Sequence, residues 1–83
     1  MPDSAMVETS SIEESIRAGL ECTHVEVRGD GAHFEAIIVS PRFEGLARVR
    51  QHQLVYAALG ERMRSEIHAL SMKTLTPEEW RSR

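Results

Sequence analysis

The stretch that decides the fold is Ile67–Leu75, which reads IHALSMKTL. Its alternate positions His68, Leu70 and Met72 share one parity, and smaller or charged side chains occupy the other. A period of two with one apolar side predicts a β-strand that covers a core with one face. His68 stands at the margin of that face, where a side chain can be partly buried and still reach a partner. Whether this histidine is a ligand or a packing residue decides the function.

Two further strands are predicted before this stretch. His24–Arg28 alternates valines with polar residues, which is typical of a half-exposed strand. His33–Ser40 is apolar on both parities and ends at Pro41, so we expect it to be the central strand. The segment Gly29-Asp30-Gly31 between the two favours a tight turn and predicts an antiparallel hairpin.

Short helices are predicted near both ends of the chain. The first carries an apolar stripe at every fourth position: Ile12, Ile16 and Leu20. We expect a capping box at its start, formed by Ser10 or Ser11 with Glu13 or Glu14. The last helix follows Thr76 as its cap, with Pro77 in the first position and Glu79 closing the box. Trp80 is expected to anchor this helix by packing back on the domain.

The segment after Pro41 predicts a turn at Gly45 and then a helix that Gly60 breaks or kinks. At 100° per residue, one broad apolar face of this helix is expected to pack on the sheet: Val49, His52, Val55, Tyr56, Leu59 and Met63. The opposite face is expected to be polar: Arg50, Gln51, Glu61, Arg62 and Arg64.

The element order is therefore α-β-β-α-α-β-α, and the fold class is α+β. A three-stranded mixed sheet with its helices on one face is the economical arrangement. If the third strand runs parallel to the second, the helical crossover between them should be right-handed. We expect residues 11–83 to form a single domain and residues 1–10 to form a flexible tail.

Composition excludes several classes of protein. The chain has 83 residues, 41% of them hydrophobic and 28% charged, as in an ordinary soluble globular domain. Its one cysteine, Cys22, rules out an internal disulfide and a self-contained cysteine zinc site, and a reducing cytoplasmic location is expected. No apolar run approaches the roughly 20 residues of a membrane span, and the acidic N-terminus is unlike a signal peptide.

Charge is spread unevenly along the chain. The net charge is −3, with −6 in residues 1–41 and +3 in residues 42–83. The acidic total argues against a generic nucleic-acid binder, although the second half can present a mildly basic surface.

Two segments of the chain resemble a known family. HFEAIIVSPRFEGLARVRQHQLVYAAL, which spans 33–59, and IHALSMKTLTPEEW, which spans 67–80, closely resemble the BolA-like family, particularly its shorter bacterial members. The resemblance covers the chain from about Ser11 to Trp80. It implies a fold like the type II KH domain with an added terminal helix, which agrees with the predicted element order.

The resemblance also implies a function. The family is associated with iron–sulfur cluster trafficking, iron homeostasis and a partner, the monothiol glutaredoxins with a CGFS motif. It implies a 2Fe–2S cluster that bridges the two proteins, with a glutaredoxin cysteine and a glutathione thiolate on one iron. On the other iron it implies His68 and a residue from the loop between the first two strands, which here is His33. Alone, the domain is expected to be apo, because two imidazoles are too few to hold a cluster.

Alternation along the strands leaves the role of His33 open. It shares parity with Glu35, away from the apolar face, whereas His68 shares parity with Leu70 and Met72. The two imidazoles would then point to opposite faces, unless His33 belongs to the loop. The alternatives are a solvated turn residue for His33 and a hydrogen-bonded structural residue for His68.

The other candidate ligands have simpler interpretations. We expect His24 to be solvated, His52 to be buried in a structural role, and Cys22 to be a small packing residue. No nucleophile–base pair, Walker loop or GxGxxG motif is present, so we expect no enzyme.

A KH-like, DNA-binding regulator of the stress response is the rival interpretation. KH domains clamp nucleic acid with a GxxG loop, which this sequence lacks. The aromatic residues available for stacking are few, and Phe34, Tyr56 and Trp80 are expected to be needed by the core. Four arginines are candidates for contacts to phosphates or to a protein partner: Arg48, Arg50, Arg62 and Arg64. A homodimer that shares ligands stays open as a further alternative.

Overall fold

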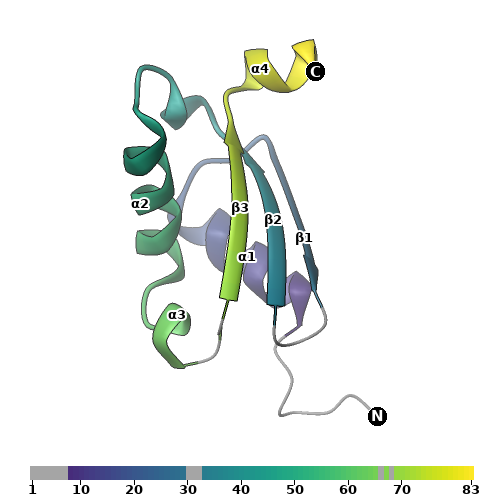
Figure 1. The fold of residues 1–83 in the computed structure, drawn as a ribbon, viewed down its shortest axis with the longest axis vertical. Helices are drawn as coiled ribbons and strands as arrows, with labels where there is room; N and C mark the ends of the chain where they lie inside the picture. Colours follow the sequence, from purple (N-terminus) through teal and green to yellow (C-terminus); the bar gives the residue numbers. More distant parts are fainter. Residues whose placement is uncertain (1–7, 30–32, 66, 68) are drawn as a thin grey trace.

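The structure is a computed structural model that describes residues 8–29, 33–65, 67 and 69–83, with the backbone alone for residues 64 and 65 (Figure 1). The chain forms these elements in order: α1 (Thr9–Gly19), β1 (His24–Gly29), β2 (His33–Val39), the 3-10 helix η1 (Pro41–Phe43), α2 (Arg48–Leu59), α3 (Arg62–Ser65), β3 (Ala69–Leu75) and α4 (Pro77–Ser82). The predicted α+β class and element order are confirmed. None of the helices in the described part of the chain combines the length and apolarity that crossing a bilayer requires.

The three strands form one mixed sheet in the order β1-β2-β3. β1 pairs antiparallel to β2, with Val27 opposite Ala36, and β3 pairs parallel to β2, with Met72 on the other side of Ala36. The predicted hairpin and the predicted central position of β2 are both confirmed.

One face of the sheet carries the core. α1 lies behind the sheet in Figure 1, and α2 and α3 flank it along β3. The buried residues of this core come from α1, α2, η1 and the sheet, or from positions next to these elements: Ile12, Ile16, Leu20, Val25, Val27, Phe34, Ala36, Ile38, Phe43, Val55, Leu59 and Ile67. The predicted stripe of the first helix is thereby confirmed. Burying one such aliphatic side chain stabilises the fold by about 1.5–3 kcal/mol.

The opposite face of the sheet, called the open face below, is not covered by α1 or α2. It carries the alternate residues of the strands: His24, Glu26, Arg28, His33, Glu35, Ile37, Val39, Ser71 and Lys73. Shallow hollows line it around Glu35 and Ile37.

The predicted inner face of α2 is wrong in part. Val55 and Leu59 are buried as expected, but Val49 is 62% exposed and Tyr56 is 42% exposed. Gln51, which was expected on the polar face, is buried instead. The helix is therefore rotated relative to the prediction, and two large apolar side chains point outward.

Gln51 explains this rotation, because its side chain finds a partner for each of its polar atoms. The amide nitrogen donates to the carbonyl oxygens of Phe43 at 3.0 Å and Leu46 at 3.1 Å. The amide oxygen accepts from the hydroxyl of Thr74 on β3 at 2.6 Å. A buried amide is tolerated when its hydrogen bonds are made, and this one joins η1, α2 and β3.

The predicted start of the first helix is also wrong. α1 begins at Thr9, so Ser10 and Ser11 lie inside the helix, and no side chain caps it. Glu13, which was expected in a capping box, instead accepts a hydrogen bond from the backbone N–H of Val27 at 3.0 Å. β1 is an edge strand, and the carboxylate satisfies one of its outward N–H groups, which helps to block pairing with another chain.

Toward the C-terminus the predictions are mostly confirmed. Gly60, at φ 60°, separates α2 from α3. β3 begins at Ala69 rather than at Ile67, because Ile67 is buried in the core and its backbone N–H donates to the carbonyl of Arg62. The capping box of α4 is present: Thr76 Oγ1 accepts from the N–H of Glu79, and the Glu79 carboxylate accepts from the N–H of Thr76.

The polar junction at Gln51 can be tested with Gln51→Met, which keeps the volume and removes the amide. The variant leaves the Thr74 hydroxyl and two carbonyls unpaired. We therefore expect its free energy of unfolding, measured by urea denaturation, to be lower than that of the wild type by roughly 2–3 kcal/mol. Gln53→Met, on the exposed side of the same helix, is the matched control and should change stability by less than about 0.5 kcal/mol. Equal stability of Gln51→Met and the wild type would contradict this role.

Candidate functional site

His33 lies at one end of the central strand. It is the first residue of β2 and is exposed. Its register partner on β3 is Ala69. A shallow hollow at this end of the sheet is lined by Arg28, Gly29, His33 and Glu35. An imidazole at this position is accessible to a partner molecule.

His68 lies outside the described residues, so the predicted pair of His33 and His68 stays a prediction. The residue that follows it in the sequence, Ala69, is the register partner of His33. Because β2 and β3 are parallel, both strands start at the same end of the sheet. The two segments that carry the predicted ligands therefore arrive at neighbouring strand ends.

The alternation predicted for these strands is confirmed where the structure describes it. His33 shares the open face with Glu35, and it belongs to β2 rather than to the loop before it, so the loop position that would have reconciled the two imidazoles is not found. β3 begins at Ala69, so its alternation does not extend to position 68 and assigns no face to that residue. Leu70 and Met72 are half-buried and pack against the core on the other face. The register sets Leu70 beside Phe34, one position beyond the pair of His33 and Ala69.

Within residues 8–29, 33–65, 67 and 69–83 there is no group of three or more His, Cys, Asp or Glu side chains arranged to hold a metal ion. His52 is half-buried, and its Nε2 atom is buried without a hydrogen-bond partner in the described part of the chain. The structural role predicted for His52 stays a prediction.

Cys22 has the environment of a packing residue. It is half-buried against the core, and its Sγ donates to the carbonyl of Leu20 at 3.2 Å. Burial raises the pKa of the Cys22 thiol, an effect that the charge of Arg17 opposes and that of Glu21 reinforces. The thiol is therefore a poor nucleophile and a poor metal ligand at neutral pH.

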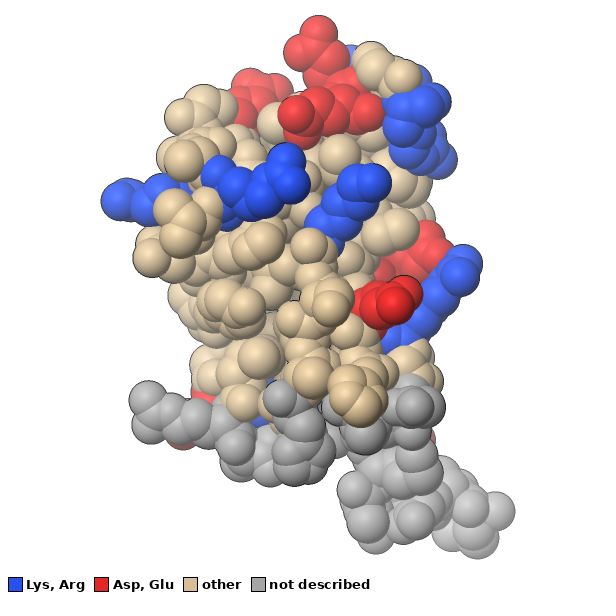
Figure 2. Space-filling view, viewed as in Figure 1, with Lys and Arg blue, Asp and Glu red and all other residues tan. Residues whose placement is uncertain are grey.

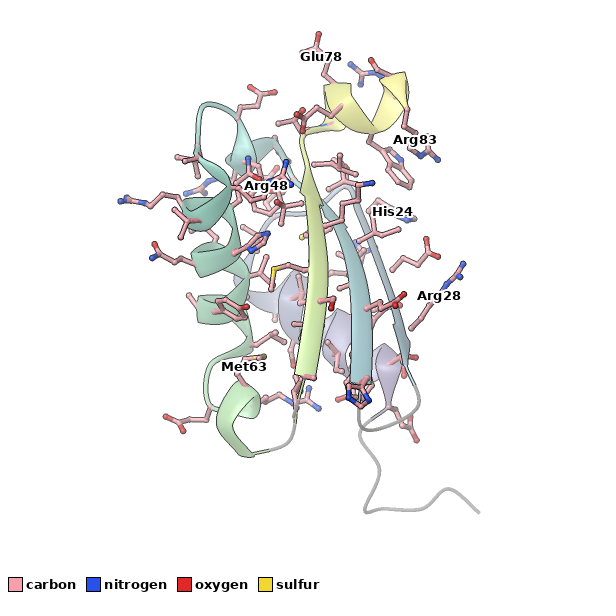
Figure 3. All side chains as sticks on the ribbon, viewed as in Figure 1. His24, Arg28, Arg48, Met63, Glu78 and Arg83 are labelled. Atoms are coloured by element: carbon pink, nitrogen blue, oxygen red, sulfur yellow. The ribbon has the colours of Figure 1, made fainter. Side chains whose placement is uncertain are left out.

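The four candidate arginines are divided between different surroundings. Arg48 and Arg50 are exposed in the first turn of α2, and Figure 3 shows Arg48 at the end of α2 that faces away from Met63. Arg62 is half-buried and donates to the carbonyl of Ser11 at 3.0 Å and to Ser15 Oγ at 2.7 Å, which ties α3 to α1. Arg64 is in α3, and its side chain lies outside the described residues.

The surface charge follows the same division. Figure 2 shows basic side chains over the part of this face where α2 lies in Figure 1, and acidic side chains toward the α4 end. Figure 3 labels Arg48 at α2 and Glu78 at α4. Arg48 and Arg50 are thus two exposed arginines on one helix turn that a partner can reach.

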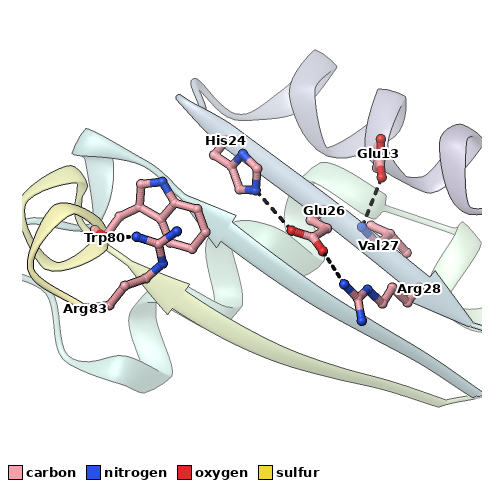
Figure 4. A network of polar contacts seen from close by, with 7 residues as sticks. All are labelled: Glu13, His24, Glu26, Val27, Arg28, Trp80 and Arg83. Atoms are coloured by element: carbon pink, nitrogen blue, oxygen red, sulfur yellow. Dashed lines mark hydrogen bonds and ion pairs between the residues drawn. The ribbon is translucent and has the colours of Figure 1, made fainter.

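A cluster around Trp80 was not predicted (Figure 4). The Trp80 ring stacks on the His24 ring, with centroids 4.6 Å apart and planes 21° apart. His24 Nε2 lies 3.3 Å from Glu26 Oε1, and Arg28 donates to Glu26 Oε2 at 3.0 Å. The prediction that His24 is solvated is therefore wrong, and Trp80 packs on the open face rather than in the core.

These contacts also affect the acidity of Glu26. Hydrogen bonds from His24 and from Arg28 hold the pKa of the Glu26 carboxyl below its usual value. The spacing of His24, Glu26 and Arg28 at alternate positions of one strand is a sequence signal that places them side by side. Nothing in the local pattern indicates that Trp80 joins them.

The fold and the site define a class: a small α+β domain with helices on one face of a mixed three-stranded sheet and an accessible histidine at the end of its central strand. The family model for the BolA-like protein matches residues 2–79. The chain belongs to the BolA-like family.

Similar proteins support this assignment. The chain is 40% identical over 75 residues to the acid stress protein IbaG of Escherichia coli K12, with 89% of each chain covered. It is 41% identical over 59 residues to the DNA-binding transcriptional regulator BolA of Haemophilus influenzae, covering 71% of this chain and 57% of the relative. A solved bolA protein homologue from Coxiella burnetii superposes with a TM-score of 0.85 at 49% identity, covering 92% of this chain and 99% of that one. These names describe a stress protein and a regulator rather than enzymes.

The raised pKa of Cys22 predicts slow reaction with a disulfide reagent at neutral pH, because only the thiolate attacks and its fraction is reduced. The rate should keep rising as the pH passes the pKa of free cysteine, about 8.5. Arg17→Gln removes a charge that lowers this pKa and should slow the reaction, whereas Glu21→Gln should speed it. A rate equal to that of free cysteine at neutral pH would contradict this account.

Proposed function

We propose that this chain is an adaptor in iron–sulfur cluster and iron homeostasis. It docks a monothiol glutaredoxin of the CGFS type and offers His68 and His33 to a bridging 2Fe–2S cluster. The observation that carries the proposal is the register of the parallel strands, in which His33 pairs with the residue next to His68. Membership of the BolA-like family supports it.

The donor set fits a shared cluster. Each iron of a 2Fe–2S cluster takes two protein ligands, and two histidines replace two cysteines at one iron in Rieske centres. Neutral imidazole is a suitable iron ligand, and His33 is exposed beside a hollow where a second molecule has access. Two imidazoles complete one iron, so the ligands of the other come from the glutaredoxin cysteine and glutathione.

When bound, the cluster supplies one-electron chemistry, and histidine ligation raises its reduction potential relative to four thiolates. The work of this chain is to present its imidazoles in the neutral form and to hold the partner. A metal-bound imidazole needs a hydrogen bond at its second ring nitrogen to fix the tautomer. Glu35, which flanks His33 in the hollow, is a candidate for that bond once a partner is docked.

Docking of the partner is assigned to exposed basic side chains. Arg48 and Arg50 stand clear of the core on the first turn of α2 and suit the carboxylates of glutathione or of the glutaredoxin. Arg62 is already hydrogen-bonded to α1, so its first role is to hold the fold together.

The test mixes the chain with a cluster-loaded monothiol glutaredoxin and follows visible absorption, circular dichroism and gel filtration. A complex with a changed spectrum is expected. His68→Ala should abolish the new spectrum, and His33→Ala should weaken or alter it, since each removes one ligand. His24→Gln, a change to another open-face histidine, is the matched control and should leave the spectrum unchanged. An unchanged spectrum and no complex with the wild-type chain would overturn the proposal.

A DNA-binding regulator is the second candidate function. The observations that favour it are the exposed Arg48 and Arg50 and the relative that is named a DNA-binding transcriptional regulator. It predicts a complex with duplex DNA that weakens steeply with salt, because each phosphate contact releases counterions. Replacing both arginines with alanine should abolish that complex. Retention of cluster binding in the same double variant would separate the two functions.

A further inference from the structure

α4 is attached to the open face of the sheet through a single aromatic side chain. Trp80 stacks on His24 of β1, as Figure 4 shows, and the Arg83 guanidinium lies 3.5 Å from the centroid of the Trp80 ring. None of the residues of α4 is buried. The docking of this short helix therefore depends on the contact between Trp80 and His24 more than on any apolar burial of its own.

His24 is the group in this contact that can gain a proton and a positive charge. Histidine is the side chain that ordinarily gains a proton between pH 8 and 5. The His24 ring touches a carboxylate on one side, with Nε2 3.3 Å from Glu26 Oε1, and an indole on the other. A proton on this imidazole creates an ion pair with the first neighbour and a cation–π contact with the second.

We propose that the stack of His24 on Trp80 is an acid-strengthened latch that holds α4 against β1. While the imidazole is neutral, the latch is a stack of two uncharged rings. In mild acid the imidazolium binds the face of Trp80 and the carboxylate of Glu26 together, so α4 is held more firmly.

The sign follows from the charges that face His24. Glu26 and Trp80 are in direct contact with its ring and attract the imidazolium. Arg28 and Arg83 repel it, but Arg28 is paired with the Glu26 carboxylate and Arg83 lies over the Trp80 ring. Because His24 and Arg28 are partly or largely exposed to water, the more distant repulsions are screened more strongly.

The remaining titratable groups near the latch do not reverse the sign. On α4, Glu79 is occupied in the capping box, and Glu78 is exposed beside it and adds a weak attraction. Glu26 on β1 pairs with Ile37 on β2, and Ile37 pairs with Lys73 on β3. Lys73 is therefore two strands away from the strand that carries His24. The lowered pKa of Glu26 keeps its carboxylate ionised in mild acid, so the carboxylate partner of the imidazolium stays charged there.

The latch lies beside a buried apolar position of the sheet. Val39 pairs with His24 on one side and with Leu75 on the other, on the face opposite the core. It is fully buried although α1 and α2 lie on the far side. The pairing places Val39 beside the residue that contacts Trp80 and beside the last residue of β3, the strand that leads into α4.

The test measures amide hydrogen exchange at Trp80, whose N–H donates to the carbonyl of Thr76 at 2.9 Å and so reports on α4. Protection factors, corrected for the intrinsic effect of pH, are compared at pH 7.5 and 5.5. The wild type should gain roughly two- to five-fold protection in acid, the size of an exposed cation–π contact. The fluorescence of Trp80, the one tryptophan of the chain, should change over the same pH range.

The variants locate the effect. His24→Gln should remove the pH dependence, and Glu26→Gln should reduce it while the rings stay stacked. His33→Gln, which removes a histidine elsewhere on the open face, is the matched control and should keep the wild-type response. Protection that is flat or falls in acid in the wild type, or a rise that persists in His24→Gln, would overturn the proposal. The Trp80 amide of His24→Gln can prove unprotected at both pH values. The Glu26→Gln variant is then the test, and a rise in its Trp80 protection factor as large as that of the wild type would contradict the latch.

Discussion

The parallel pairing of β2 with β3 is the constraint on which the rest of the structure depends. Two parallel neighbours cannot be joined by a tight turn, so the chain must cross over the sheet between them. That crossover is α2 with α3, and it supplies the second helix of the layer that buries the core. The same pairing brings the start of β3 to the start of β2, where His33 is exposed.

A polar contact then sets how the crossover sits on the sheet. Gln51 bonds to η1 and to Thr74 of β3, which turns Val49 and Tyr56 outward. The strands, the hairpin and the breaks at Gly45 and Gly60 could be predicted from alternation and glycine alone, because those signals are local. The rotation of α2 could not be predicted in this way. A hydrophobic pattern assigns glutamine to the surface, and it contains no information on the buried hydrogen-bond partners that this side chain finds.

The candidate site was predictable to a similar extent. The resemblance to a family pointed to His33 and His68, and alternation placed His33 on the open face beside Glu35, as the structure has it. The start of α1 was missed, because Glu13 serves the edge of β1 rather than a helix cap. The stack of Trp80 on His24 joins residues far apart in the sequence, so it depends on the whole topology and has no local signature.

The proposed function requires that His33, at the start of β2, and His68, which precedes β3 in the sequence, ligate one iron of a shared cluster. The most direct measurement is pulsed electron paramagnetic resonance of the reduced complex, with this chain alone labelled with ¹⁵N-histidine, which counts imidazole nitrogens bound to iron. The account predicts two such nitrogens in the wild type and one in each of His33→Gln and His68→Gln, with no change in His24→Gln or His52→Gln. A count that is the same in the wild type and in His33→Gln would contradict it.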